Sequence, residues 1–352
     1  MTWLHRYTKL VAASTLLLIA AGGMVTSTGS GLSVPDWPNT YGWFMFSFPM
    51  EKWVGGIQYE HSHRLIASTV GFLTIILAVW TWRVDPRPSV RTLGFAALGA
   101  VILQGVLGGV TVLLKLPPAV SIGHAGLAQL FFCITLSLAV FTSRSWIAAD
   151  DEGRAARPID DAWLRRLATA TTLLVYVQIL LGATMRHTNA GLAIPTFPLA
   201  FGHVLPPAWT SAIAIHFAHR VGALLVTAAI FATTVYVRVH HASRRELVRP
   251  AMLLVVLVAA QIMLGGFVVW SALQPTVNTI HVVNGALVLG TSLVLTLRSY
   301  RSKLLAADSR VSLDAPHVAD GSAPVTSAFR AGGHVGLSSD APRPAVEKGT
   351  PA

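Results

Sequence analysis

The chain has 352 residues, of which 53% are hydrophobic and only 12% are charged, and its formal net charge is +11. Soluble domains carry about 25% charged residues, so this composition excludes a water-soluble globular enzyme and indicates a polytopic membrane protein. The positive charge does not require a nucleic-acid partner, because Lys and Arg retained on cytoplasmic loops give the same excess. The single Cys133 excludes an internal disulfide, a cysteine-based zinc site and a cysteine-ligated iron–sulfur cluster.

Eight apolar stretches follow one another along the chain. Each is long enough, at about 1.5 Å per residue, to cross a hydrocarbon core of about 30 Å. They cover residues 8–26, 63–82, 93–114, 122–142, 167–185, 213–237, 251–272 and 278–297. The first stretch follows Arg6 and Lys9 in the manner of a signal peptide. Because it has a counterpart deep in the chain, we expect it to be retained as a helix.

The basic residues predict the orientation of these spans. Lys and Arg gather before the first span and in every second loop after it. The opposite loops hold Lys52, Lys115 and Arg186, with Arg64 and Arg220 at helix starts. Because positively charged loops stay in the cytoplasm, we expect a multi-pass protein of the cell (inner) membrane with both termini in the cytoplasm.

The sequence contains two copies of one pattern. TGSGLSVPDWPNTYG, from Thr28, matches TNAGLAIPTFPLAFG, from Thr188, at an offset of 160 residues. QGVLGGVTV, from Gln104, matches QIMLGGFVV, from Gln261, at an offset of 157 residues. So small a drift indicates a duplication, and four spans per half make both repeats enter the membrane in the same direction.

We therefore expect an all-α membrane protein in which eight transmembrane helices form two pseudo-symmetric four-helix bundles. The expected parts are an N-terminal half (residues 1–143), a cytoplasmic linker (144–166), a C-terminal half (167–303) and a cytoplasmic tail (304–352). The tail is rich in Ser, Ala, Pro and Gly, and its composition predicts disorder.

Four histidines occupy matching positions at the starts of the even-numbered spans: His63, His124, His219 and His281. Even spans run from the outside inward, so all four imidazoles are expected near the outer end. Neutral imidazole is an iron ligand, and two facing helices can supply both axial positions of a porphyrin. We expect one bis-histidine heme site per half, pairing His63 with His124 and His219 with His281. The alternative is that these histidines bond only to backbone or water at helix ends.

Two arginines and one carboxylate stand beside these histidines. Arg64 and Arg220 directly follow His63 and His219, where they could bind heme propionates or extend to the lipid headgroups. Glu60 lies three residues before His63 on the same helix face. A carboxylate at this depth is costly and usually functional, although it could also be a solvated group at a helix N-terminus.

The two halves differ at this carboxylate. Its counterpart is His216, and Asp36 is likewise replaced by Thr196. The acidic groups of the first half suggest that chemistry takes place there, while the second half holds a cofactor. The remaining histidines on the outer side have no assigned role; they are His61, His187, His203 and His216.

The spans, the duplication, the TGSGLSxPDWP loop and the ExxHR motif at Glu60–Arg64 together resemble the heme A synthase family over residues 1–300. That family is an oxidoreductase family that oxidises the C8 methyl of heme O, by successive hydroxylation, to the formyl group of heme A for terminal oxidases. The resemblance implies that His63 and His124 ligate the substrate heme O, that His219 and His281 ligate a heme B cofactor, and that Glu60 is a catalytic acid or base. It also implies heme O synthase, an electron acceptor and membrane lipid as partners.

One departure from the family pattern concerns the first outer loop. Many relatives carry a cysteine pair there, and this chain has Val34 and Thr40 instead. The sequence leaves open how the loop is held.

Two other functions stay open at this point. A diheme b-type cytochrome that carries electrons would use the same bis-histidine ligation, although hemes at two depths would suit transmembrane transfer better. A binding or transport protein would also fit parallel repeats, but the spans lack obvious breaks near the middle of the membrane.

Overall fold

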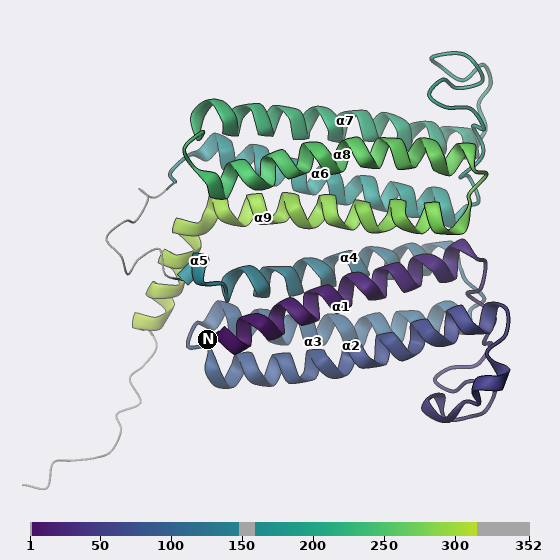
Figure 1. Cartoon of the computed structure of the whole chain (residues 1–352), viewed down its shortest axis with the longest axis horizontal. Coiled ribbons are helices and arrows are strands. Elements are labelled where there is room, and N and C mark those ends of the chain that lie inside the picture. The colour runs from purple at the N-terminus through teal and green to yellow at the C-terminus, as the bar shows by residue number, and fades with distance from the viewer. Residues whose placement is uncertain (1, 148–158, 315–352) are drawn as a thin grey trace, which may run out of the picture. The chain divides into compact units, whose positions relative to one another are not determined.

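The computed structural model describes residues 2–147 and 159–314, and within these residues eight long α-helices dominate the protein (Figure 1). They are α1 (Thr2–Ser27), α2 (Gly56–Val84), α3 (Pro88–Leu113), α4 (Pro118–Phe141), α6 (Ala162–His187), α7 (Ser211–His240), α8 (Arg245–Trp270) and α9 (Pro275–Asp314), with the short α5 (Arg144–Ile147) after α4. All eight are long and apolar enough to cross a membrane, which confirms the predicted spans.

Local sequence explains where several of these helices begin. Pro88, Pro118 and Pro275 each occupy the first helical position, where a missing N–H costs nothing and the fixed φ already suits a helix. Asp161 and Thr210 cap α6 and α7, since each side chain accepts a hydrogen bond from the backbone N–H three residues further on.

The long helices form two groups that follow the two halves of the sequence. In the first group α1 packs on α2 and α4, and α3 packs on the same two helices; α6–α9 repeat this arrangement in the second group. The groups meet where α1 and α4 contact α9 and α6, as the two stacked sets of helices in Figure 1 show. Each group has its own core, one including Leu77 and Leu138 and the other including Ile230 and Leu254.

Small residues let the two groups approach closely. A Cβ on Gly126 of α4 would lie 2.7 Å from Leu180 of α6, and one on Gly290 of α9 would lie 2.9 Å from Leu136 of α4. Such close backbones are typical of helix contacts in membranes, where van der Waals packing replaces the hydrophobic driving force.

A polar contact also crosses between the groups. Arg186 of α6 donates through Nη2 to Gly23 O (3.0 Å) and Ser27 Oγ (2.5 Å) of α1. The Ser27 hydroxyl in turn lies 3.1 Å from Thr279 Oγ1 of α9. One arginine thus connects elements of both halves.

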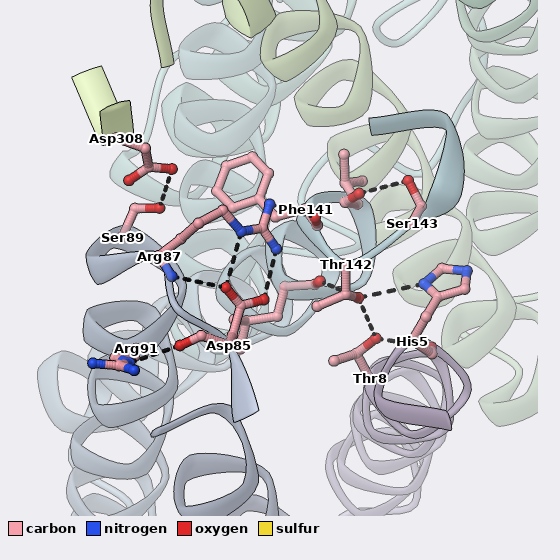
Figure 2. Close-up of polar contacts among 12 residues, drawn as sticks. His5, Thr8, Asp85, Arg87, Ser89, Arg91, Phe141, Thr142, Ser143 and Asp308 are labelled. Carbon is pink, nitrogen blue, oxygen red and sulfur yellow. Dashed lines mark hydrogen bonds and ion pairs between the residues drawn. The ribbon is translucent and has the colours of Figure 1, made fainter. Parts of the chain in front are cut away.

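The two ends of the bundle differ in character. The end named here the loop end carries the long α1–α2 and α6–α7 connections, and the terminal end carries the N-terminus and α5 (Figure 1). At the terminal end Arg87 binds both carboxylate oxygens of Asp85 and donates to Phe141 O (Figure 2). Thr142 contacts Thr8 and His5 beside this pair, so α1, α3 and α4 are tied together there.

The last helix extends past residue 303, where the sequence predicts that the C-terminal half ends. α9 runs to Asp314 because residues 304–305 still have apolar surface to bury: Leu304 and Leu305 pack against the first core. Ser89 also donates to Asp308 at 2.7 Å (Figure 2). The helix thus continues into the first residues of the predicted tail, and the rest of that tail lies outside the described residues.

Candidate functional site

The structure places all four predicted histidines near the loop end. Each lies six to eight residues after the first residue of its helix, and these helices all start at the loop end. His63 and His124 are close enough for their charges to interact, and so are His219 and His281. The predicted partners are thus brought together within each half.

Each of these imidazoles packs against a glycine of the preceding helix. A Cβ on Gly22 would lie 3.0 Å from His63 Cε1, and a Cβ on Gly182 would lie 2.9 Å from His219 Cε1. Gly108 and Gly265 stand in the same relation to His124 and His281, each at 3.3 Å. Any larger residue would push the ring away, so the four glycines set the position of the four imidazoles.

Three of the four imidazoles also have a glutamine partner. Gln178 Nε2 lies 3.0 Å from His219 Nδ1, and Gln104 and Gln261 lie 3.3 Å from Nε2 of His124 and His281. Each glutamine also donates to the backbone carbonyl of its histidine. His63 has no such partner among the described residues, since Leu18 occupies the matching place on α1.

The residues present fit a porphyrin iron. His63, His124 and His281 each have a buried Nδ1 without a hydrogen-bond partner, so each has a ring nitrogen whose ligand the described residues do not supply. In the described part of the chain, no three His, Cys, Asp or Glu side chains cluster in a way that could hold a bare metal ion. Two imidazoles suit a metal that a macrocycle already holds in its plane.

The first loop (residues 28–55) is held over this site by α2. Arg64 donates through Nη1 to the carbonyl oxygens of Asp36 (2.7 Å) and Asn39 (2.9 Å), and through Nη2 to Val34 O (2.8 Å). Thr40 Oγ1 lies 3.1 Å from Nδ1 of the buried His61. Val34 and Thr40, which replace the cysteine pair, are thus both fixed by contacts to α2.

The second loop (residues 188–210) is held in the same way by α7. Arg220 donates to four loop carbonyl oxygens, those of Ile194, Thr196, Pro198 and Leu199, at 2.7–3.4 Å. In both halves the arginine after the histidine therefore binds loop backbone. The sequence suggests heme propionates as partners of Arg64 and Arg220. In the structure both guanidinium groups already bind loop carbonyl oxygens.

Glu60 is almost fully buried, with 3% of its surface exposed, and both of its oxygens are bonded. Oε2 accepts a hydrogen bond from Val34 N (2.8 Å), and Oε1 binds Arg64 Nη2 (2.7 Å). Its counterpart His216 is buried to the same extent and lies 3.3 Å from the backbone N of Ile194, the matching loop residue. This position therefore anchors a loop in both halves, and only the first half does so with a carboxylate.

Asp36 closes a turn within the first loop. Its two oxygens accept hydrogen bonds from Tyr41 N and Gly42 N, both at 2.8 Å. Burial alone would raise the pKa of Asp36, but these two donors and the nearby Arg64 outweigh it and lower the pKa from its ordinary value. Thr196 Oγ1 accepts from Phe201 N at 2.8 Å in the second loop, so the acidic residue and its replacement share one structural role.

The aromatic residue of each loop reaches the helix glycines. A Cβ on Gly109 would lie 2.5 Å from Trp37 Cδ2, and a Cβ on Gly266 would lie 3.0 Å from Phe197 Cδ1. The first glycine of each GG pair in α3 and α8 thus faces an imidazole, and the second faces a loop aromatic ring. The loops pack directly beside the histidine sites.

The histidines without an assigned role have separate places. His61 is buried beneath the first loop between Phe48 and Trp53. His187, at the end of α6, is close enough to His124 for their charges to interact across the two halves. His203 closes a small turn with Ala200 by two backbone hydrogen bonds.

Sequence reasoning missed the glycines and glutamines that fix the histidines. Part of the signal was present, since the matched QxxLGG segments of the two halves contain Gln104 with Gly108 and Gln261 with Gly265. Their meaning depends on which helix faces which histidine, and a repeat alone does not give that pairing.

Comparison with known proteins agrees with this geometry. The sequence model of the cytochrome oxidase assembly protein family matches residues 5–293. The chain is 30% identical over 260 residues to the heme A synthase of Shouchella clausii, covering 73% of this chain and 84% of that protein. It is 31% identical over 258 residues to that of Symbiobacterium thermophilum (71% and 80%) and 27% identical over 311 residues to that of Geobacillus kaustophilus (86% and 94%). The chain therefore belongs to the heme A synthase family.

Proposed function

We propose that this protein is a heme A synthase that oxidises the C8 methyl group of heme O to a formyl group by successive hydroxylation. The proposal rests on four histidines that lie in pairs, one pair in each half, and that each pack against a glycine of a neighbouring helix. They occur in a chain whose relatives are named heme A synthases. Oxidation of a methyl group to a formyl group inserts one oxygen atom, from water or dioxygen, and removes electrons and protons, so the reaction needs an oxygen source, an electron path and a proton acceptor.

The two halves are assigned different hemes. We place the substrate heme O between His63 and His124, beside the loop that Glu60 anchors, and a heme B cofactor between His219 and His281. A bound heme B would supply reversible one-electron chemistry. Two features distinguish the first half from the second: its loop anchor is a carboxylate, and its His63 has no glutamine partner. They support treating the first half as the one in which a ligand is exchanged.

In this assignment Glu60 has two tasks at one position. Its Oε2 holds Val34 N and thereby the loop over the substrate, as His216 does in the second half. Its carboxylate, which is paired with Arg64 and stands three residues before His63, is our candidate for the proton acceptor of the first half. A carboxylate at this position can accept a proton. An imidazole that is hydrogen-bonded to the loop, as His216 is in the second half, is a poorer proton acceptor.

Topology follows from the basic residues of the terminal end. We place that end, with both termini, in the cytoplasm of a cell-membrane protein, and the histidine sites toward the outer face. Heme O synthase as the supplier of substrate and a separate electron acceptor complete the proposed set of partners.

The first test identifies the hemes bound to the purified protein from cells that make heme O. Non-covalent hemes are extracted with acidic organic solvent and resolved by chromatography with mass detection. Heme B together with heme O, its hydroxylated form or heme A is the expected result. Heme B alone, at two per chain, would instead establish the diheme b-type cytochrome.

The second test separates the two tasks of Glu60 with variants that the internal repeat suggests. Glu60→Gln keeps an acceptor for Val34 N but no charge, and Glu60→His copies the anchor of the second half. Both should keep bound heme and a protected loop, and both should lose heme A formation by at least about 100-fold, within the range of general acid–base catalysis. Normal heme A output from Glu60→Gln, which has no group that could accept the proton, would show that the residue only anchors the loop.

A further inference from the structure

A groove unrelated to the histidine sites lies on the lipid-facing side of the bundle, where the two halves meet. α9 forms its floor, with α8 on one side and α4 on the other, and its volume is about 360 Å³. Its lining is mostly apolar and includes Phe132 and Leu136 of the first half and Leu253, Leu287 and Val294 of the second.

Two arginines stand at the terminal end of this groove. Arg249 of α8 is exposed and forms no ion pair within the described residues. Arg298 of α9 donates through Nη1 to Glu246 O at 2.9 Å and is close enough to Arg249 for their like charges to interact. The Glu246 carboxylate, whose charge interacts with Arg298, also lies 3.4 Å from Arg244. The groove therefore ends at two positively charged side chains, Arg249 and Arg298, whose combined charge the single Glu246 carboxylate does not neutralise.

The groove is separate from the heme sites. Arg298 follows His281 by 17 residues on the same helix, which places the two about 25 Å apart along its axis. Its apolar walls also run from the level of the arginines into the span, in the direction that an acyl chain takes from a headgroup.

We propose that this groove binds one anionic phospholipid of the leaflet at the terminal end. The phosphate lies between Arg249 and Arg298, and the acyl chains lie against α4, α8 and α9. Basic sites between transmembrane helices are typical of headgroup recognition, and planar guanidinium groups bind phosphate oxygens in pairs. Because α4 belongs to one half and α8 and α9 to the other, the bound lipid joins the two halves.

The test measures lipid binding by native mass spectrometry of the full chain, purified in detergent and stripped of lipid. Phosphatidylglycerol, phosphatidylcholine and inorganic phosphate are added in separate titrations. The wild-type protein should retain one phosphatidylglycerol in preference to the other two. At about 1 kcal/mol per arginine, Arg249→Gln/Arg298→Gln should weaken that binding about 30-fold.

Three further variants make the result specific. Arg249→Lys/Arg298→Lys keeps both charges and should retain most of the binding, whereas Leu253→Trp fills the groove with both arginines in place and should abolish it. Arg238→Gln/Arg245→Gln removes two exposed arginines outside the groove and should bind lipid as the wild type does. Helical circular dichroism and elution volume verify that each variant is folded.

Any of three results would overturn the proposal. These are equal affinity for phosphatidylglycerol and phosphatidylcholine, equal binding by Arg249→Gln/Arg298→Gln and its Arg238→Gln/Arg245→Gln control, and a dimer of this chain that Leu253→Trp dissociates. The last result would assign the groove to a second copy of the protein.

Discussion

The glycines of the GG pairs have different tasks although they are neighbours in the chain. Gly108 faces the His124 ring and Gly109 faces the Trp37 ring, whereas Gly105, one turn earlier, has open space around it. The same residue type therefore does three different things on one helix. Only the contacts across helices distinguish them.

Substitution by alanine should separate two of these cases, a glycine that faces an imidazole and a glycine in open space. Gly182→Ala and Gly22→Ala place a methyl group within about 3 Å of an imidazole, so we expect a loss of stability of about 1–3 kcal/mol and a weakened bis-histidine absorption spectrum of the affected half. Gly105→Ala should stabilise the helix by up to about 1 kcal/mol with an unchanged spectrum. Unchanged heme spectra in both Gly22→Ala and Gly182→Ala would disprove the proposed histidine positions.

Asp36 gives the first loop a dependence on pH that the second loop lacks. Its pKa is lowered in the folded protein, so the carboxylate stabilises the loop above its unfolded pKa of about 4 and this contribution is lost as the pH falls through the folded pKa. Amide exchange of a peptide covering residues 36–44, corrected for intrinsic rates, should therefore rise at acidic pH. Asp36→Thr, which copies the second loop, should stay protected without this dependence, and Asp36→Ala should be unprotected throughout.

Single residues show where sequence reasoning reached its limit. The histidines and Glu60 were found because titratable groups in an apolar span are conspicuous. The structure adds that Arg64 and Arg220 bind loop carbonyl oxygens, and backbone acceptors leave no trace in the sequence. The acidic pattern of the first half also proved ambiguous, because Asp36 and Thr196 close equivalent turns.

At the scale of helices, the eight spans could be predicted because length and apolar composition suffice in a membrane. Their ends could not, since polar residues continue each helix beyond the hydrocarbon core. α9 is the clearest case, because its extension is stabilised by Leu304 and Leu305 against the other half. Contacts of that kind depend on the tertiary fold.

The glutamines of α3, α6 and α8 each fix one histidine helix against its neighbour. Gln261→Leu should remove the partner of the His281 ring while leaving the helix apolar and intact. Loss of such a supporting contact typically lowers metal-site affinity about 10–100-fold, so the heme B that we propose for the second half should dissociate faster. Leu18→Gln offers the converse test, since it would give His63 the partner that the other histidines have.

At the scale of the whole molecule, the contact between halves combines small residues with the Arg186 hydrogen bonds. Arg186→Met should remove both bonds to α1 at a cost of about 1 kcal/mol, as measured for hydrogen bonds within membranes. Unfolding in mixed micelles gives that cost, and Arg186→Lys should recover part of it. A variant as stable as the wild type would show that helix packing alone holds the halves together.

The common depth of the four histidines has a further consequence. A charge that crosses the membrane gains or loses about 2.3 kcal/mol for every 100 mV of membrane potential. A charge that passes from one half of this protein to the other moves parallel to the membrane plane and does no such work. Charge transfer between the halves is therefore expected to be insensitive to voltage, in an energised and in a depolarised cell alike.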